Sequence, residues 1–371
     1  MSPTSRSVSL AAVAASLLLA TACGGGTPTP AQVDLGSGPA TAGTVKKDAL
    51  KGVNLTFVSY GGVYQKGQQD AAVDPFAKES GAQVLQDGPT DYAKIKAQVD
   101  SSNVTWDVVD TDAVWAEAQC GKLLQPLDYS IIDKSKIPDG LATECSVPAM
   151  QYGMVLAYNA KKFGANPPQD WKDFFDTAKF PGKRGYPGLP GDAAPGPWEA
   201  ALIADGVAPD QLFPLDTDRA NKKLDSVRSS LVFWKTGAES QQLLESGEVD
   251  MAMVWSGRAY AAVKNGASFQ VQWNQWMPIM DTLGVPKNAK NPKAAMALIN
   301  YYLGAQQQAK LTELTSYSPI NTDAKPGLDE LGTSFLTTQP EVAPKAVPID
   351  SKWWADNQPA MIEKWSAWLG G

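Results

Sequence analysis

The stretch GEVDMAMVWSGRAY, residues 247–260, decides the fold. It contains a short apolar run, residues 249–254, that ends at Trp255, and this pattern predicts a buried strand. Ser256 interrupts the run, and we expect it to be the N-cap of a helix that contains Arg258. Because ligands of open α/β sheets bind outside the carboxyl ends of the strands, we expect Trp255 and Arg258 at the mouth of a pocket.

An acidic residue follows the next apolar stretch of the chain. That stretch contains four large apolar residues, Trp276, Met277, Ile279 and Met280. Asp281 follows directly, so we expect it to face the same crevice. A guanidinium, a carboxylate and an indole would then surround one space. This set fits a small zwitterion with a carboxylate at one end and an ammonium at the other.

Length and composition bound the class of protein. The chain has 371 residues, more than one average domain, so two lobes are expected. Its formal net charge of −7 argues against a nucleic-acid surface, which would be basic. The sequence contains no histidine, which excludes His-dependent triads, imidazole proton shuttles and His metal sites. We expect no cofactor and no metal.

The N-terminal residues have the pattern of an exported protein. Residues 1–22 carry a basic residue, Arg6, before an apolar run that ends in small residues, as secretory signals do. Cys23 and the glycines after it resemble the lipobox of bacterial lipoproteins, although Ala20 stands where leucine is more usual. Residues 23–50 are therefore expected to be a lipidated cysteine and a flexible tether. The alternative is an ordinary signal peptide with an incidental cysteine.

Two cysteines remain in the expected mature chain. Cys120 and Cys145 form an even pair in a compartment that is expected to be oxidising, which predicts a disulfide between them. The alternative is two buried free thiols.

Strand and helix patterns alternate from residue 53 onward. Strand patterns cover 53–58, 83–86 and 106–109, with helical stretches between them. Asp112 is placed to cap a helix that runs to Cys120. This series predicts a parallel sheet with right-handed crossovers, and hence an α/β fold.

The second half of the chain continues this alternation. An apolar strand pattern at 150–158 leads out of the first lobe, and 283–287 has the pattern of a return strand. A long amphipathic helix is expected over 291–314. Tryptophans and apolar residues at helical spacing over 353–369 predict a C-terminal helix.

These features together resemble the extracytoplasmic solute-binding proteins of ABC importers, in the branch that binds polyamines and GABA. The resemblance depends on the order and spacing of VSYGG (58–62), WDVV (106–109), 171–184, 247–258, 280–281, 291–303 and 353–369. It implies a type II periplasmic-binding-protein fold, in which two α/β lobes close on a solute. The implied lobes are 51–152 with 284–371, which includes the C-terminal helical segment, and 153–283. The crossover strands are expected near 150–158 and 281–285.

The resemblance also implies which residues bind the solute. In the first lobe it points to residues at strand ends, namely Tyr60, Tyr64, Thr111 and Asp112. Trp255 matches an aromatic residue of the second lobe, and Asp281 matches the acid that holds an amine. Glu199 matches, more loosely, an additional acid of the polyamine binders.

Arg258 separates the two kinds of solute. An arginine at this place would repel the far ammonium of a diamine, whereas the resemblance to GABA-type members implies that it holds a carboxylate. The leading hypothesis is therefore a monomeric, non-enzymatic lipoprotein that binds GABA or a similar ω-amino acid for a membrane permease. Alternatively, Arg258 pairs with Asp281 or Glu248 or is solvated, and Trp255 is a plain core residue.

Other readings stay open. Tyr60 and Tyr64 are alternatively surface aromatics, and Asp112 is alternatively only a helix cap. A polyamine-binding protein would use Asp281 and Glu199. A secreted glycoside hydrolase would use paired carboxylates, and a surface or sensory lipoprotein would share the fold without transport. The Tyr301-Tyr302 pair resembles the tyrosines of ferric-binding relatives, but its place on a long helix predicts core residues.

Overall fold

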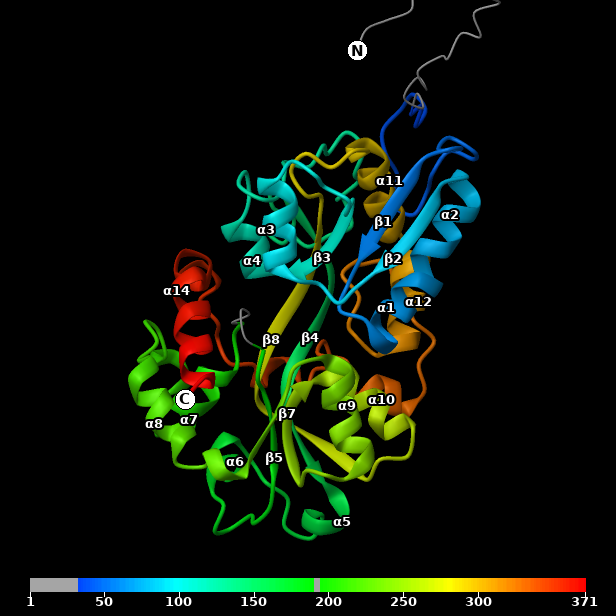
Figure 1. Cartoon of the computed structure of the whole chain (residues 1–371). Helices are drawn as coiled ribbons and strands as arrows, with labels where there is room; N and C mark the ends of the chain where they lie inside the picture. Colours follow the sequence, from blue (N-terminus) through cyan, green and yellow to red (C-terminus); the bar gives the residue numbers. More distant parts are fainter. Residues whose placement is uncertain (1–32, 190–193) are drawn as a thin grey trace, which may run out of the picture. The chain divides into compact units, whose positions relative to one another are not determined.

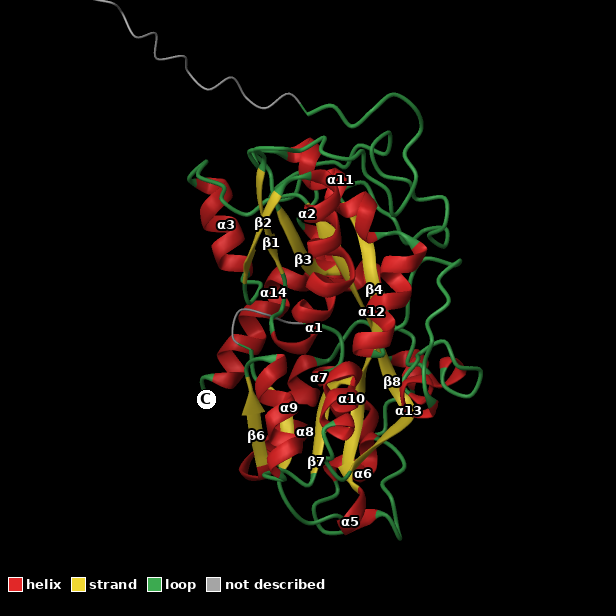
Figure 2. Ribbon diagram, turned by 90° about the vertical axis from the view of Figure 1, so that its right-hand side faces the viewer, coloured by secondary structure: helices red, strands yellow, loops and turns green. Residues whose placement is uncertain are grey.

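The computed structural model describes residues 33–189 and 194–371. The predicted signal sequence and Cys23 lie outside the described residues. Figure 1 and Figure 2 show a mixed sheet with helices packed around it. Among the helices of the described ranges, none is both long and apolar enough to span a membrane.

The strands are β1 (Asn54–Val58), β2 (Gln83–Asp87), β3 (Val108–Asp112), β4 (Ser146–Asn159), β5 (Arg184–Pro187), β6 (Leu231–Trp234), β7 (Met251–Trp255) and β8 (Phe269–Gly284). The helices are α1 (Gly62–Gln68), α2 (Asp74–Ser80), α3 (Tyr92–Asp100), α4 (Ala113–Ala118), α5 (Ala160–Phe163), α6 (Trp171–Phe175), α7 (Pro197–Ala204), α8 (Thr217–Asp225), α9 (Gly237–Ser246), α10 (Ser256–Lys264), α11 (Pro292–Tyr302), α12 (Ala305–Thr315), α13 (Glu330–Ser334) and α14 (Ser351–Leu369).

The strand order explains how one sheet makes two lobes. It is β2-β1-β3-β8-β4-β7-β5-β6, so the long strands β4 and β8 lie in the middle. On one side β2, β1 and β3 are parallel, and β3 is antiparallel to β8. On the other side β6, β5 and β7 are parallel, and β7 is antiparallel to β4. Each lobe is thus a parallel α/β unit completed by the shared central pair, which is the predicted type II architecture.

The strands β4 and β8 carry the chain between the lobes. Asp281 to Gly284 of β8 pair with β3, whereas Met154 to Tyr158 of β4 pair with β7. The return crossover therefore precedes Asp281, and the expected position at 281–285 is too late. The return strand predicted over 283–287 shares only its first two residues with β8, which ends at Gly284. The sequence pattern also contains no information about the strand that pairs with it. The residue limits of the two lobes stay a prediction.

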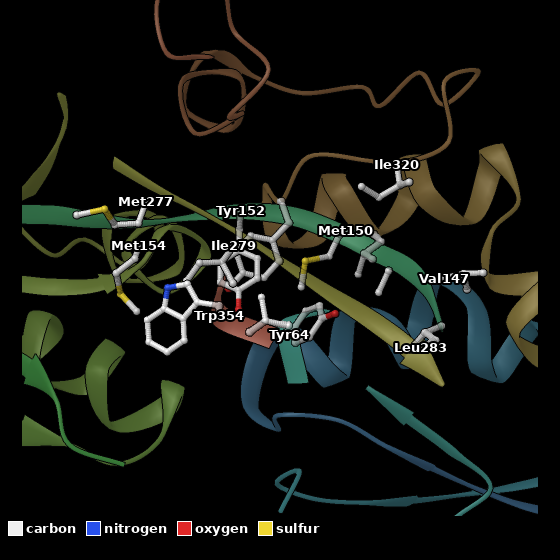
Figure 3. Packing of buried hydrophobic residues seen from close by; sticks show 14 of the residues in the cluster. Tyr64, Val147, Met150, Tyr152, Met154, Met277, Ile279, Leu283, Ile320 and Trp354 are labelled. Atoms are coloured by element: carbon white, nitrogen blue, oxygen red, sulfur yellow. The ribbon is translucent and has the colours of Figure 1, made fainter. Parts of the chain in front are cut away.

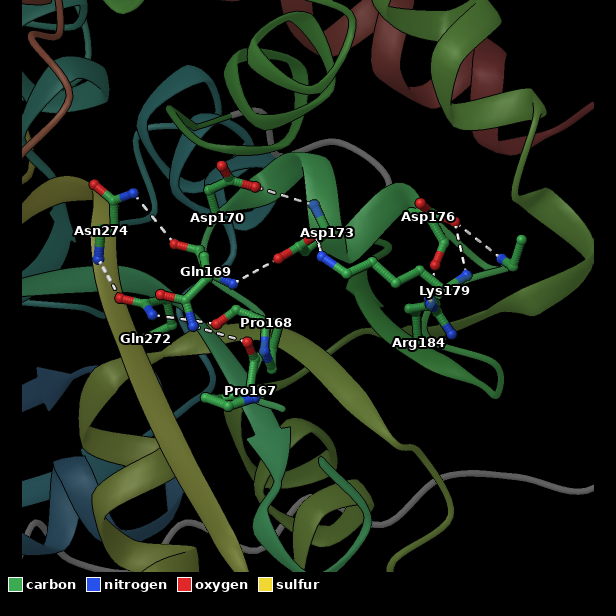
Figure 4. Close-up of polar contacts among 11 residues, drawn as sticks. Pro167, Pro168, Gln169, Asp170, Asp173, Asp176, Lys179, Arg184, Gln272 and Asn274 are labelled. Carbon is green, nitrogen blue, oxygen red and sulfur yellow. Dashed lines mark hydrogen bonds and ion pairs between the residues drawn. The ribbon is translucent and has the colours of Figure 1, made fainter. Parts of the chain in front are cut away.

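A bulge in β8 is held by the loop before α6. Relative to β4, strand β8 carries extra residues between Gln272 and Met277. Gln272 Nε2 and Asn274 Nδ2 donate to the backbone oxygens of Pro168 and Gln169, at 3.2 Å each (Figure 4). Because a slip of one residue would turn every side chain of a strand to its other face, these contacts help to fix the face that the end of β8 presents.

The segment before β1 is docked on the first lobe. Gly43 N donates to Asn300 O at 2.9 Å, and Asn300 Nδ2 donates to Thr41 O at 3.0 Å. Leu50 is completely buried. The expected tether, 23–50, is therefore too long at its C-terminal end, because composition alone does not reveal hydrogen bonds to α11.

The helix expected over 291–314 is divided into α11 and α12. Gly304 lies at the division, where a Cβ would overlap the Cα of Gly43. The interruption lets the N-terminal segment approach the helices closely, and an amphipathic period does not report it. Tyr301 and Tyr302, at the end of α11, are buried as expected for core residues.

The predicted C-terminal helix, α14, touches both lobes. It packs against α4 of the first lobe. Towards the second lobe, Trp354 Nε1 donates to Glu199 Oε1 at 2.8 Å, and Trp368 Nε1 donates to Asp225 Oδ1 at 2.9 Å. The sequence analysis assigned this helix to the first lobe. The structure shows that α14 also contacts the second lobe.

The apolar core continues through the crossing between the lobes. Tyr152 and Met154 of β4 and Met277 and Ile279 of β8 are buried in one cluster with Tyr64 of α1 (Figure 3). The lobes are therefore in contact along the floor of the space between them.

The predicted disulfide between Cys120 and Cys145 is present. It connects the residues after α4 with the start of β4, within the first lobe.

Candidate functional site

Strand ends from both lobes meet at one place. The loop after β1 carries Tyr60, and β3 ends at Asp112. On the other side β7 ends at Trp255, Arg258 lies in the first turn of α10, and Asp281 lies near the end of β8. The expected placement of these residues at the carboxyl ends of strands is confirmed for Asp112 and Trp255.

The start of α10 differs by one residue from the expectation. The helix begins at Ser256, and Trp255 occupies the N-cap position. The Ser256 Oγ accepts a hydrogen bond from Gly153 N at 3.3 Å instead of capping α10. A contact with β4, which is distant in the sequence, therefore outweighs the local capping preference of serine.

Arg258 is a buried cation that reaches the opposite lobe. Its side chain is 1% exposed, and its Nη2 donates to Gly61 O at 3.0 Å. The Nε and Nη1 groups have no acceptor among residues 33–189 and 194–371. Within those ranges no ion pair joins Arg258 to Asp281 or Glu248, and the side chain is not solvated, so these alternatives are wrong.

Two glycines make room for this guanidinium. A Cβ at Gly62 would lie 2.8 Å from Arg258 Nη1, and a Cβ at Gly237 would overlap the guanidinium itself. Gly62 opens α1 in the first lobe and Gly237 opens α9 in the second. The guanidinium is therefore enclosed between the first turns of two helices, and neither position tolerates a larger residue without displacing it.

Asp281 is the buried acid of the site. It is 2% exposed and accepts a hydrogen bond from the Tyr152 hydroxyl at 3.0 Å. Burial, together with the negative charge of Asp281, raises the pKa of Tyr152 well above its usual value. Tyr152 therefore stays a neutral donor to Asp281 at physiological pH. Asp281 lies opposite Asp112 in the pairing of β8 with β3, so two carboxylates are neighbours.

Aromatic rings connect the basic and acidic ends. The Trp255 ring lies 6.0 Å from that of Tyr60, 6.3 Å from that of Tyr152 and 5.1 Å from that of Trp234, measured between centroids. Because Tyr152 binds Asp281 and Tyr60 belongs to the opposite lobe, Trp255 stands at the centre of the site. It is only partly buried, so it is not a plain core residue.

Tyr317 belongs to this group, although no sequence pattern predicted it. Its ring lies 4.8 Å from Tyr152 and 5.4 Å from Tyr64, and a Cβ at Gly257 would overlap it. Burial raises the pKa of Tyr317, while the charge of Arg258 opposes this shift and that of Asp281 adds to it. Tyr317 therefore lies within the field of both charges, although it comes from an irregular segment after α12.

Tyr64 contacts a second buried acid, Asp110, which was also missed. The Tyr64 hydroxyl donates to Asp110 Oδ2 at 2.7 Å, and Ser59 Oγ and Gln68 Nε2 donate to the same oxygen. Burial raises the pKa of Asp110 to about 7, although these hydrogen bonds oppose the shift. Asp110 Oδ1 has no partner in the described part of the chain. Tyr64, 2% exposed, is thus not a surface aromatic.

The residues expected at the end of β3 have structural contacts. Asp112 Oδ1 accepts from Val114 N at 2.9 Å and so caps α4, as expected. Burial raises the pKa of Asp112 to about 6. The Thr111 hydroxyl lies 3.5 Å from that of Thr282 on the neighbouring strand. A role for Asp112 or Thr111 in binding stays a prediction.

Glu199 is completely buried at the start of α7. Its Oε2 accepts from Gly196 N and its Oε1 from Trp354 Nε1, both at 2.8 Å. Burial raises the pKa of Glu199 to about 6. Both carboxylate oxygens are thus engaged by the protein, so a role as the additional acid for a polyamine stays a prediction without support from these contacts.

A cavity of about 480 Å³ opens beside these residues, between the two lobes. Its first-lobe wall includes Tyr60 and Tyr92, and its second-lobe wall includes Trp255 and Gly237. This volume suits a small organic molecule. The lining also includes the charged residues Asp91, Lys94 and Lys235, and Arg258 and Asp281 are not part of it.

Comparisons with known proteins agree with this architecture. A gamma-aminobutyric acid-binding protein of Pseudomonas aeruginosa is 31% identical over 85% of this chain and 90% of its own length. A spermidine/putrescine-binding periplasmic protein of Haemophilus influenzae is 27% identical over 78% of this chain and 81% of its own. The solved structure of the Atu4243-GABA receptor is 41% identical, with a TM-score of 0.76, and covers 85% of this chain and 97% of that one.

These relatives are named as binding proteins for small solutes. Residues 71–344 match the family model of bacterial extracellular solute-binding proteins. The chain therefore belongs to the bacterial extracellular solute-binding proteins. Its buried arginine and buried acid lie where the two lobes of its sheet meet.

Proposed function

We propose that this protein binds GABA or a similar ω-amino acid between its lobes, outside the cytoplasm, and delivers it to an ABC permease. The observation that carries this proposal is Arg258, a cation that is 1% exposed and whose Nε and Nη1 have no acceptor among residues 33–189 and 194–371. A buried charge without a partner costs several kcal/mol in desolvation, on the order of 3–5 kcal/mol. A solute carboxylate would supply the missing acceptors.

The other end of the site suits an ammonium group. Asp281 is a buried carboxylate that accepts a hydrogen bond from the neutral Tyr152 hydroxyl, so it presents negative charge at this end of the site. Trp255 and Tyr60 offer aromatic faces, which attract cations and pack against aliphatic chains. A molecule lacking either charge would leave one buried group unmatched, at a cost of about 1–3 kcal/mol. This is a physical basis for selecting a zwitterion.

Closure follows from the contacts that the solute would make. Arg258 and Trp255 belong to the second lobe and Tyr60 and Gly61 to the first, so a solute at this place touches both. A ligand that binds the closed state better than the open one shifts the population towards closure.

The position and assembly of the protein are parts of the same proposal. The relatives named above are binding proteins, and two of them are named as periplasmic or receptor proteins. We infer an extracytoplasmic monomer that is anchored by a lipid at Cys23, which lies outside the described residues.

Calorimetry tests the proposal directly. GABA and 5-aminovalerate should bind, whereas butyrate and putrescine, which each lack one charge type, should bind at least about 10-fold more weakly. Asp281→Asn should abolish binding of GABA while leaving the thermal midpoint of the unliganded protein within a few degrees. Tighter binding of putrescine than of GABA would overturn the zwitterion assignment.

A polyamine is the second candidate, because several relatives are named for spermidine and putrescine. Asp281 would hold one ammonium and Glu199 the other. Arg258 speaks against it, since a buried cation repels a diamine. The same calorimetry decides between the two solutes.

A further inference from the structure

We propose that the N-terminus of α9 forms the second half of the carboxylate site, with the main-chain N–H groups of Gly237 and Ala238 donating to the anion that Arg258 binds. This inference rests on the proposed function, because it assigns a partner to the same end of the solute. The added binding group consists of main-chain amides, so no charged side chain and no sequence motif marks it in the sequence.

The first turn of α9 has donors without acceptors. Thr236 is the N-cap, and its Oγ1 accepts from Glu239 N at 3.1 Å, which satisfies the third residue of the helix. No acceptor is found for Gly237 N or Ala238 N in the ranges that the structure describes. Helix N-termini with free N–H groups bind anions, because the N–H groups point outward and the helix dipole places partial positive charge there.

The second observation is the placement of Arg258. The guanidinium lies against Gly237, where a Cβ would overlap it, and its Nε and Nη1 are buried without acceptors within residues 33–189 and 194–371. A cation at a helix N-terminus is unfavourable, since both carry positive charge. Glu239, the acid in the first turn of α9, accepts from Lys235 N instead.

The buried guanidinium of Arg258 and the first-turn amides of α9 therefore converge where Gly237 lines the cavity between the lobes. Only an anion satisfies both at once. A carboxylate has two oxygens, so one can accept from Arg258 and the other from the α9 amides. Gly237 is then required twice, for the approach of Arg258 and for access of the carboxylate to the main chain.

The structure supplies a matched control in α3. That helix also begins at the wall of the same cavity, and its N-cap Asp91 accepts from Lys94 N at 2.9 Å. Ala93 holds in α3 the position that Ala238 holds in α9, and both alanines are exposed. Arg258 lies against α9 and not against α3.

Ala238→Pro removes the amide hydrogen at the second position of α9, where the first turn tolerates proline. The preceding Gly237 has no Cβ to clash with the proline ring. We expect this variant to bind GABA at least about 10-fold more weakly by calorimetry, as for a lost hydrogen bond to a charged group. Ala238→Ser keeps the amide hydrogen and should therefore bind GABA more tightly than Ala238→Pro does.

A measurement on the wild-type protein covers the case in which the proline variant does not fold. In amide NMR spectra, GABA should shift the Ala238 N–H proton downfield and leave that of Ala93 nearly unchanged. If the wild type binds GABA and Ala238→Pro binds it with the same affinity, this inference is overturned and the proposed function stands. The same holds if the wild type binds GABA but its Ala238 N–H proton does not shift downfield. Absence of binding by the wild type to GABA and 5-aminovalerate overturns both.

Discussion

At the scale of single residues, the site contains polar atoms that the protein does not satisfy. Arg258 Nε and Nη1 and Asp110 Oδ1 are buried without partners among the described residues. Such atoms are destabilising, and natural proteins keep them mainly at functional sites. The unliganded site is therefore less stable than its surroundings, and substitutions there should separate stability from binding.

Replacing Arg258 by methionine tests this separation. Arg258→Met keeps much of the side-chain volume and removes a buried, incompletely bonded charge, so the unliganded protein should become more stable by about 1–3 kcal/mol. GABA binding should fall at least about 100-fold. Urea denaturation and calorimetry give the two values. Arg258→Lys is the control that keeps the charge and loses the planar fork. A destabilised Arg258→Met protein would mean that the arginine serves mainly the fold.

Asp110 should make the stability depend on pH. Its pKa is raised to about 7 in the folded protein, above the ordinary value of 3.8, so the folded state binds more protons between these values. Stability from this group is present below pH 4 and is lost as the pH rises towards 7. Asp110→Asn should therefore flatten the decline of the thermal midpoint between pH 5 and pH 8. If the thermal midpoint of Asp110→Asn still falls as much between pH 5 and pH 8, the pH dependence comes from Asp112 or Glu199, whose pKa values are also raised.

The sequence marked Trp255, Arg258 and Asp281 as site residues by their places beside apolar stretches and by the family resemblance. The structure places Trp255 at the end of β7, Arg258 in α10 and Asp281 in β8, and their role in binding stays a prediction. Tyr317 and Asp110 could not be found in this way, because Tyr317 lies in an irregular segment and Asp110 is one of two acids on β3. Their roles depend on contacts between residues that are far apart in the sequence.

At the scale of elements, buried polar contacts attach helices to one another. Glu199 caps α7 and simultaneously accepts from Trp354 of α14, so one carboxylate joins both helices. The sequence predicted each helix but not this connection. The sequence analysis also did not predict the division between α11 and α12 or the bulge of β8. The spacing of apolar residues does not show where another segment contacts a helix or where a strand contains extra residues.

Trp354→Phe tests the connection between α7 and α14. It removes the donor to a buried carboxylate, so the free energy of unfolding should fall by about 1.5–3 kcal/mol. Trp368→Phe removes a similar bond to the exposed Asp225 and should cost less than about 1 kcal/mol. GABA affinity should stay within about 3-fold in both variants. A large loss of affinity in Trp354→Phe would favour a binding role for Glu199.

At the scale of the whole molecule, the chain length predicted two lobes and the family resemblance implied two crossover strands, and the comparisons with solved structures agree. The pairing register, which places Asp281 beside β3, was beyond reach of the sequence pattern. Register depends on which strands meet, and this is decided by the packing of both lobes.

The disulfide should contribute to stability without contributing to binding. Cys120 and Cys145 are 25 residues apart, so their bond restricts the unfolded chain, and its loss in a Cys120→Ser, Cys145→Ser protein should cost about 3 kcal/mol. GABA affinity of the folded double variant should be unchanged. Denaturant titrations with and without GABA measure both quantities, and a loss of affinity would show that the first lobe needs this bond to shape the site.

The double contact of α14 has a practical consequence. Its Trp354 is fixed to the second lobe, while the helix also packs against α4 of the first lobe. Lys352, at the start of α14, has a side chain that is 83% exposed. A fluorescent dye attached through Lys352→Cys would therefore sense the closing of the molecule from a place remote from the solute. The same chain that captures the solute would then serve as an optical sensor for it, with every residue of the site left intact.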